Sequence, residues 1–477
     1  MVKRPAPSEE IDGFRLGKRI HSGAMGRIYT VTRPGRVTPM IMKVPRLGRN
    51  ESSENILGFQ TEAQILRALS GPHVPRYVAG GDLTKTPYLV TEWIEGESLE
   101  RVLSCGPLAH EEVVSIGAAI ADAVHSLHRQ DAIHLDLKPG NIILKPSGRA
   151  ALIDFGLAHH ARFPDLHAEE KRFAAGSAPY ISPEQVLGTR SDPRSDIFSL
   201  GVILYEMATG KLPFGVPATL AGLRDRVWLD PVPPGDRSKY MPPWLQEIIL
   251  RCLEPDAQNR YQSAADLGFD LRHPEQVALT ERASKSGRAG LLAQMRRWWR
   301  ALGERPALHL MPLAKTDSVP VIMVAVDTTH PDDPRQPVLQ RATARVLSLS
   351  QEYRLICVSV VRSGPVAKGT SIAASASGMH LEHLVRLRHW VEPLQLPERR
   401  CSLHVIESPR PERTLLEFAH RNRADIILLG APSRKDHALA WWRSVASGVT
   451  ANAPCSVYVV RIPEPDSGNL ASDRGPT

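Results

Sequence analysis

An ordered series of short polar motifs constrains the first half of this chain more than any other feature. A glycine pair in the segment 23–26 comes first, then Lys43 after an apolar strand and Glu62 in a helical pattern. The run His-Leu-Asp-Leu-Lys-Pro-Gly-Asn at 134–141 and the triplet Asp-Phe-Gly at 154–156 follow. Each motif alone is weak, because a glycine pair marks a turn more often than a phosphate site. Their occurrence together, in this order, indicates one fold and one chemistry.

This series resembles the signature set of the protein kinases, and the resemblance covers residues 12–275. It implies a bilobal α+β fold with a sheet-based N-terminal lobe and a helical C-terminal lobe. Lys138 and the pair Gly176-Ser177 are similar to the Ser/Thr-specific branch. The implied activity is transfer of the γ-phosphate of ATP to Ser or Thr hydroxyls of protein substrates. Further matches are structural: Glu184 with Arg260 as an anchoring ion pair, and Asp196 as the brace of the catalytic segment.

The resemblance also implies a role for each catalytic residue, because phosphoryl transfer depends on positioning and on neutralising phosphate charge. Asp136 would accept the proton of the substrate hydroxyl, and Lys138 would stabilise the transferring group. Asn141 and Asp154 would bind Mg²⁺ through oxygen ligands, and the ion would bridge the phosphates of ATP.

Nucleotide binding is expected at the glycine pair, at Lys43 and at residues 91–94. Lys43, held in place by Glu62, would contact the α and β phosphates, and the backbone of residues 91–94 would hydrogen-bond adenine. The residues implied to contact or position the nucleotide are Ile20, Gly23, Gly26, Ile28, Lys43, Glu62, Glu92, Ile94, Asn141 and Asp154.

Two departures from the family pattern bear on nucleotide binding. His21 stands where the family has the first of three glycines, and Ile41 stands where alanine is usual in the strand that ends at Lys43. The larger Ile41 side chain lies against the expected adenine site. A nucleotide-binding pseudokinase scaffold is therefore the main alternative to an active kinase, and a stress-sensing dimer with a secondary kinase domain is a third.

Two further departures are coupled. Leu135 replaces the arginine that precedes the catalytic aspartate and that pairs, in the family, with a phosphorylated residue of the activation loop. Between Gly156 and Gly176 there is no Ser, Thr or Tyr. The phosphate acceptor and its arginine are missing together, so we expect a kinase that is not switched on by phosphorylation within that loop.

The region 317–463 predicts a second domain of the α/β class. Short apolar runs alternate with helical segments, which indicates a doubly wound parallel sheet. The expected strands are 321–327, 355–361, 403–407, 424–430 and 456–462. Val324-Ala325-Val326-Asp327, the run 424–430 and the run 454–461 resemble the universal stress protein family. The pairing with a kinase domain resembles bacterial kinases of the eukaryotic-like type.

The resemblance leaves the ligand of this second domain open. Nucleotide-binding members of the family hold ATP near the ends of the first and fourth strands, here Asp327 and Gly430. Their glycine pattern is only partly kept, because Ser433 and Arg443 replace two glycines and Ser444 alone completes it. Glycines let backbone N–H groups approach phosphates. ATP binding, homodimerisation and sensing of a small ligand therefore all stay open.

Basic residues concentrate between the two domains. The segment 276–316 carries eight Lys or Arg against two Glu, a net charge of +6, while the whole chain has a formal charge of +8. Its stretch 290–302 is an expected amphipathic helix with Trp298 and Trp299 beside arginines. The open alternatives are packing on a domain, an ordinary solvated run of charges, and weak contact with anionic membranes. No nucleic acid partner is expected, because no binding fold accompanies the patch.

The remaining features predict a cytoplasmic protein. The five cysteines are odd in number and scattered, with no Cys-x-x-Cys pair, so the sequence indicates neither a disulfide framework nor a zinc site. No run approaches the roughly 18 apolar residues needed to span a bilayer. The tail 464–477 is expected to be disordered.

Overall fold

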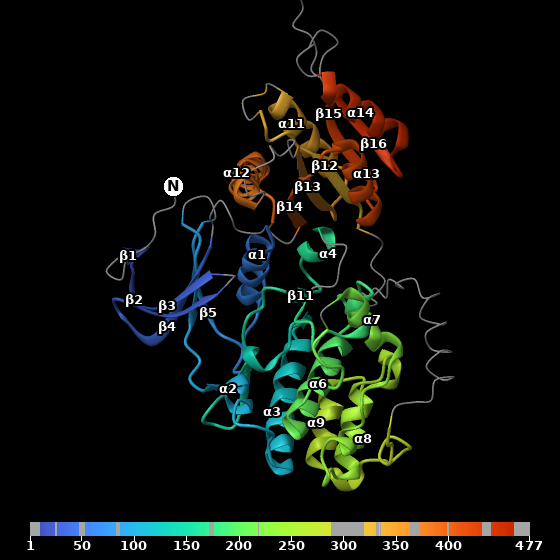
Figure 1. Cartoon of the computed structure of the whole chain (residues 1–477). Coiled ribbons are helices and arrows are strands. Elements are labelled where there is room, and N and C mark those ends of the chain that lie inside the picture. Colours follow the sequence, from blue (N-terminus) through green and yellow to red (C-terminus); the bar gives the residue numbers. More distant parts are fainter. Residues whose placement is uncertain are drawn as a thin grey trace, which may run out of the picture. The chain divides into compact units, whose positions relative to one another are not determined.

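The computed structural model describes two compact units of the chain, and Figure 1 shows their elements. The described residues are 10–23, 26–46, 53–82, 86–170, 176–217, 219–287, 319–330, 333, 335–362, 373–397, 400–431 and 440–461. The first unit is represented by residues 10–287 and the second by 319–461. Within these ranges, no helix combines the length and apolarity of a transmembrane span.

An antiparallel sheet of six strands forms the N-terminal lobe of the first unit, in the order β1-β2-β3-β4-β6-β5. Met40 and Met42 alternate with Ile41 and Lys43 along β4, so the two pairs lie on opposite faces of the sheet. The methionines are buried in an apolar cluster, which leaves Ile41 and Lys43 on the functional face. The elements are β1 (Glu10–Ile11), β2 (Phe14–Gly23), β3 (Gly26–Arg33), β4 (Arg36–Pro45), α1 (Ser53–Ala68), β5 (Tyr77–Gly80) and β6 (Leu89–Glu92).

The rest of the first unit is a helical lobe built around α3 and α6. Most positions of α6 are buried, and α3 buries its apolar stripe, as its helical spacing predicts. The helices are α2 (Leu99–Leu103), α3 (His110–His128), α4 (Leu166–Glu170), α5 (Pro183–Val186), α6 (Arg194–Thr209), α7 (Leu220–Trp228), α8 (Pro243–Cys252) and α9 (Ala264–Arg272). The 3-10 helices are η1 (Pro139–Asn141), η2 (Pro234–Asp236), η3 (Ala257–Asn259) and η4 (Pro274–Gln276).

Short strands of the helical lobe carry the expected catalytic motifs. They are β7 (Glu97–Ser98), β8 (Ala132–Ile133), β9 (Ile142–Leu144), β10 (Ala150–Leu152) and β11 (His159–His160). Residues 134–141 lie between β8 and β9, and Asp154 lies two residues after the end of β10. Since β9 and β10 pair antiparallel, the chain returns Asp154 to the catalytic segment.

The first residues of the basic segment lie on the helical lobe. In residues 277–287, which we call the strap, Lys285 Nζ lies 2.8 Å from the Asp230 carboxylate. Arg282 Nε lies 2.9 Å from the Glu247 carboxylate, and Glu247 is only 2% exposed. Two of the eight basic side chains counted in 276–316 are therefore neutralised by the lobe. The expected helix at 290–302 lies outside the described residues, as does the tail 464–477.

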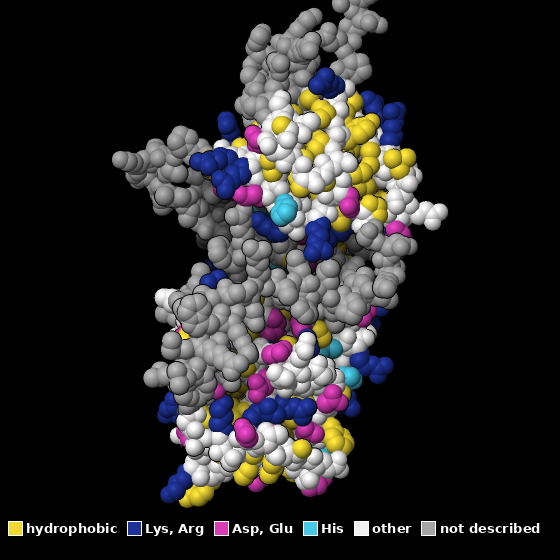
Figure 2. All heavy atoms as spheres, turned by 90° about the vertical axis from the view of Figure 1, so that its right-hand side faces the viewer, with side chains coloured by type: hydrophobic (Ala, Val, Ile, Leu, Met, Phe, Trp, Pro, Cys, Tyr) yellow, Lys and Arg dark blue, Asp and Glu magenta, His cyan; other side chains and the backbone are white. Residues whose placement is uncertain are grey.

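The second unit is the predicted α/β domain with a five-stranded parallel sheet in the order β14-β13-β12-β15-β16. All five predicted strands are present: β12 (Val321–Ala325), β13 (Arg354–Val361), β14 (Cys401–Glu407), β15 (Ile426–Ala431) and β16 (Ser456–Arg461). The helices are α11 (Arg335–Leu347), α12 (Ala373–Val391), α13 (Pro411–Arg421) and α14 (Ala440–Asn452), with η5 at Glu392–Leu394. Helices α13 and α14 cover one face of the sheet, and α11 and α12 cover the other. Hydrophobic side chains gather on one side of this unit (Figure 2).

Candidate active site

A buried aspartate at the start of α6 holds the catalytic segment. Asp196 accepts hydrogen bonds of 2.9 Å from the backbone N–H groups of His134 and Leu135, and its carboxylate lies 2.9 Å from His128 Nε2. Burial alone would raise the pKa of Asp196, but the hydrogen bond from His128 and the nearby charges outweigh it and lower that pKa. Leu135 adopts the left-handed conformation, with φ of 60°. The brace predicted for Asp196 is present.

Asp136 is the centre of a polar cluster. Its carboxylate accepts hydrogen bonds from Lys138 Nζ at 3.0 Å, from Asn141 Nδ2 at 3.2 Å and from the Ser177 N–H at 2.7 Å. Lys138 Nζ also lies 3.0 Å from Ser177 Oγ. Asp136 is 7% exposed, so these donors fix its orientation. The structure thus brings together the base and the lysine that the sequence indicates.

A second cluster joins both lobes. Lys43 Nζ in β4 lies 2.5 Å from Glu62 Oε2 in α1 and 3.2 Å from Asp154 Oδ1. Burial disfavours the ammonium of Lys43, yet the two carboxylates outweigh burial and hold its pKa above the ordinary value. For Asp154, burial is likewise outweighed by Lys43, which lowers the pKa of this carboxyl. The site therefore keeps a lysine cation beside an aspartate anion.

The contact between α1 and the Asp-Phe-Gly triplet keeps Glu62 close to Lys43. A Cβ at Gly58 of α1 would lie 3.4 Å from the Gly156 carbonyl oxygen, and a Cβ at Gly156 would lie equally close to the Gly58 carbonyl. Both distances are at the close limit of ordinary van der Waals contact, so the two backbones lie against each other with no side chain between them. Two glycines therefore let the helix backbone pack directly on the triplet.

The expected nucleotide-facing residues share one face of the N-terminal sheet. Ile28 is paired with Lys43, and Ile41 is paired with Thr91, so these side chains point to the same side as the Lys43 ammonium. The segment of the glycine pair is a hairpin in which Gly23 opposes Gly26. A Cβ at Gly26 would lie 2.6 Å from the Val44 carbonyl oxygen, so this position requires glycine.

The remaining predicted contacts lie at the margins of this face. Ile20 in β2 is 40% exposed, and Ile94 is half-buried just beyond β6. The Glu92 carboxylate lies 3.4 Å from Arg76, so the structure does not bring this side chain to Lys43. The Glu92 backbone N–H donates to the Arg76 carbonyl at 3.0 Å, so its backbone carbonyl is the group left for the hydrogen bond to adenine that the kinase resemblance implies.

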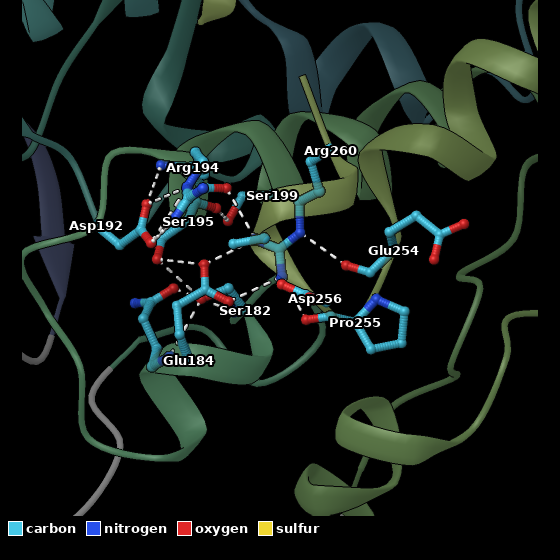
Figure 3. Close-up of polar contacts among 12 residues, drawn as sticks. Ser182, Glu184, Asp192, Arg194, Ser195, Ser199, Glu254, Pro255, Asp256 and Arg260 are labelled. Carbon is cyan, nitrogen blue, oxygen red and sulfur yellow. Dashed lines mark hydrogen bonds and ion pairs between the residues drawn. The ribbon is translucent and has the colours of Figure 1, made fainter. Parts of the chain in front are cut away.

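An ion pair with several further hydrogen bonds holds α5, which follows the catalytic cluster (Figure 3). Arg260 NH1 and NH2 each lie 2.8 Å from one oxygen of Glu184, and Arg260 is fully buried. Arg260 also donates to the carbonyls of Glu254, Pro255 and Arg194. Glu184 accepts a further hydrogen bond of 2.7 Å from Ser195 Oγ. The predicted ion pair is therefore present and fully hydrogen-bonded.

The candidate ligand site of the second unit is only partly described. Asp327 follows β12, and its carboxylate accepts hydrogen bonds from the N–H and hydroxyl of Thr329 in its own loop. Gly430 lies within β15, and a Cβ there would meet no atom within 4 Å. Ser433 and the side chains of Arg443 and Ser444 lie outside the described residues. The geometry therefore does not assign a ligand to this unit.

Two residues of the site make contacts that were not predicted from the sequence. His128, at the end of α3, bonds to Asp196, although its sequence neighbourhood indicates only an amphipathic helix. Ser177 forms hydrogen bonds with both Asp136 and Lys138, whereas its sequence motif indicates only a resemblance to the Ser/Thr-specific kinases. Its position after Gly176 and before Pro179-Tyr180 was the available signal.

Comparisons with known proteins agree with this geometry. Residues 14–268 match the family model described as protein kinase domain, and residues 319–461 match the universal stress protein family. The chain is 31% identical over 270 residues to serine/threonine-protein kinase PknB of Mycolicibacterium smegmatis, covering 56% of this chain and 43% of the relative. It is 33% identical over 259 residues to probable serine/threonine-protein kinase CPE1738 of Clostridium perfringens, covering 54% and 38%. Serine/threonine-protein kinase pkn2 of Myxococcus xanthus is 34% identical over 272 residues, covering 55% and 32%.

The match to these relatives is confined to one part of each chain. The chain spans less than half the length of the curated relatives it matches, and the matched part is the first unit. The kinase model alone covers more than half of the present chain, and the order of its motifs agrees with the two polar clusters described above. The chain therefore belongs to the protein kinase family, with a C-terminal domain that matches the universal stress protein family.

Proposed function

We propose that this chain is an ATP-dependent serine/threonine protein kinase. The observation that supports this proposal most strongly is that both polar clusters are formed together in one structure. Lys43 contacts Glu62 and Asp154, while Asp136 contacts Lys138 and Ser177. Phosphoryl transfer needs both arrangements at once, one to hold phosphate charge and one to orient the attacking hydroxyl.

The residues present fit ATP with a divalent cation. Asn141 Nδ2 donates two hydrogen bonds to Asp136, one to its carbonyl oxygen and one to its carboxylate, which leaves Asn141 Oδ1 as the atom for a metal. Asp154 contributes a carboxylate, so the pair offers the hard oxygen donors that Mg²⁺ prefers. Bound Mg²⁺ would neutralise phosphate charge, and Lys43 would add a cation to the α and β phosphates.

Asp136 orients the nucleophile in this proposal. Its carboxylate is held by three donors, so an incoming Ser or Thr hydroxyl would meet an acceptor of fixed direction. Lys138 contacts Asp136 and Ser177 together, and from there its ammonium would stabilise charge on the transferring group.

Transfer of label from γ-labelled ATP to a protein substrate tests the proposal. We expect the full chain to form phosphoserine or phosphothreonine, and we expect Lys43→Met and Asp154→Asn to abolish the label. Exposed Arg101, whose side chain is 80% accessible, supplies the matched control Arg101→Met. ATP binding without any transfer by the unaltered chain would instead support the pseudokinase scaffold.

The C-terminal domain has a regulatory or partner-binding role in this proposal. Its edge strand β16 carries Tyr458, which is 52% exposed, on a unit with hydrophobic side chains at its surface (Figure 2). An exposed edge strand is a template for pairing, which supports a homodimer through this domain. Sedimentation of the full chain and of Tyr458→Lys would measure this dimerisation.

The basic segment adds a weak contact with anionic membranes, and the scattered free thiols support a cytoplasmic location.

A further inference from the structure

The first part of the activation segment, residues 154–184, lacks the phosphorylated residue and the arginine partner that hold it in related kinases. No residue between Gly156 and Gly176 has a hydroxyl that a kinase can phosphorylate, and Leu135 supplies no cation to bind a phosphate. Leu135 is buried, and its carbonyl accepts a hydrogen bond of 2.8 Å from Gln185 instead. Another interaction has to fix the part of the segment next to the triplet 154–156.

That part contains a nearly buried ion pair. Arg190 Nε, from the loop that precedes α6, lies 3.1 Å and 2.9 Å from the two oxygens of Asp165. The side chains of Arg190 and Asp165 are 10% and 15% exposed. His159 Nδ1 also lies 3.3 Å from the Asp165 carboxylate. Buried guanidinium–carboxylate pairs of this kind are far less screened by solvent than surface pairs.

The ion pair is connected directly to the triplet. Arg190 NH2 donates 2.8 Å to the carbonyl of Leu157, the residue that follows Gly156. Asp165 caps α4 by accepting a hydrogen bond of 3.0 Å from the Ala168 N–H. From α4, His167 Nε2 donates 2.7 Å to the Gly156 carbonyl. Two short paths therefore lead from the ion pair to the backbone beside Asp154.

We propose that Asp165 and Arg190 are positioning residues that replace activation-loop phosphorylation, with the Asp165 carboxylate taking the part of the phosphate and Arg190 that of its arginine. The proposal rests on the kinase function proposed above. Because Gly156 packs on Gly58 of α1, an ordered triplet also keeps Glu62 near Lys43. The pair thus supports both the metal-binding aspartate and the phosphate-binding lysine without a covalent modification.

The Asp165 carboxylate stays ionised, so the ion pair needs no covalent modification to form. Burial would raise the pKa of Asp165, but Arg190 and His159 outweigh it and hold that pKa well below its usual range. The carboxylate is therefore ionised at every pH at which the protein works, whereas a phosphorylated side chain is present only after a kinase has acted. The fold supplies at all times the anion that related kinases acquire by modification.

Steady-state kinetics of the full chain test the proposal. We expect Asp165→Asn and Arg190→Gln each to lower kcat by roughly 10- to 100-fold, with KM for ATP changed less than about threefold. Each substitution misplaces the backbone beside Asp154 but removes no residue expected to contact ATP. Arg190→Lys should recover part of the loss, and the double variant should cost no more than either single one. The control Arg162→Ala removes an exposed pair with Asp131 in the same segment and should leave kcat unchanged. Wild-type kcat in folded Asp165→Asn or Arg190→Gln would overturn the proposal.

Two further measurements do not depend on the kinetics of the variants. Hydrogen exchange of residues 155–170 should become faster in Asp165→Asn and stay unchanged in Arg162→Ala; equal protection in both overturns the proposal. Treatment of the wild-type chain with a protein phosphatase should leave kcat within about twofold, and loss of activity overturns it even where a variant fails to fold. A wild-type chain without Asp136-dependent transfer contradicts the kinase function itself, and the exchange experiment then still shows whether the pair orders the segment.

Discussion

Two sets of buried, hydrogen-bonded charged residues organise the helical lobe. Glu184 and Arg260 form a two-point ion pair, and Asp196 is held by His128 and by two backbone N–H groups. The cost of such groups lies in desolvation, which only complete hydrogen bonding offsets. Loss of one partner is therefore more damaging than loss of the whole pair.

Glu184→Gln measures the cost of losing one partner of the buried pair. The amide cannot neutralise Arg260, which has no exposed surface in its side chain, so a buried cation is left without its anion. We expect the free energy of unfolding to fall by about 3–5 kcal/mol, measured by urea denaturation. Arg101→Met, which breaks the exposed pair with Glu97, should change it by less than about 1 kcal/mol. Equal effects of the two substitutions would contradict the account.

His160 makes the stability of the first unit depend on pH. Burial lowers its pKa to about 4, and its Nδ1 accepts a hydrogen bond from the Arg162 N–H, which requires the neutral ring. The unfolded chain takes up the proton near pH 6.5. Between those two values the unfolded state therefore binds more protons, so stability falls as the pH falls from about 6.5 to about 4.

The thermal midpoint at several pH values measures this effect. We expect the wild-type chain to lose roughly 1–3 kcal/mol of stability between pH 7 and pH 4.5 through this one group. His160→Asn keeps an acceptor oxygen and cannot be protonated, so its loss over that range should be smaller. The matched substitution His21→Asn, at an exposed position, should follow the wild type. A His160→Asn profile that is parallel to the wild type would refute the assignment.

At the scale of elements, the strap extends the folded part of the kinase unit beyond α9. The Gln246 amide donates to three backbone carbonyls of the strap, at residues 282, 283 and 285. Arg282 and Thr280 satisfy the buried carboxylate of Glu247. The strap is therefore a structural element of the lobe, although its sequence is typical of a charged linker.

Arg282→Met tests the strap. The substitution keeps most of the apolar stem and removes the cation that faces Glu247, a carboxylate with only 2% of its surface exposed. We expect about 1–3 kcal/mol of lost stability by denaturant unfolding of the full chain. The substitution Arg413→Met in α13, which breaks an exposed pair with Glu417, is the matched control in the second unit. An unchanged midpoint for Arg282→Met would show that the strap contributes nothing.

The elements that the sequence predicts are those with a periodic or ordered signal. The five strands of the C-terminal sheet follow from their apolar runs, and all are confirmed. The helix that carries Glu62 is expected from the ordered kinase motifs and is present as α1. The Asp165–Arg190 pair and the strap were not predicted. Asp165 and Arg190 are 25 positions apart, and only the tertiary fold brings them together. Charged residues in such segments show no periodicity, so the sequence does not distinguish a buried pair from a solvated one.

At the scale of the molecule, the chain combines a kinase unit with a universal stress protein unit. The excess positive charge belongs mostly to the segment 276–316, so neither unit needs a polyanionic partner to explain its composition. The kinase unit gathers the residues proposed for phosphoryl transfer into two polar clusters. The departures His21 and Ile41 lie on the face of the sheet that carries Lys43. The central question is therefore whether the complete cluster around Asp136 carries out transfer.

The rate of phosphate transfer by the full chain, compared with Asp136→Asn, answers that question most directly. Nucleotide affinity, measured in parallel by titration with ATP and Mg²⁺, serves as the control for folding. We predict that Asp136→Asn lowers kcat by roughly 10²–10⁴-fold, because the acceptor of the hydroxyl proton is lost, while the affinity for ATP changes less than about twofold. Equal transfer by both proteins, or no transfer by the wild-type chain while it binds ATP, would contradict the account.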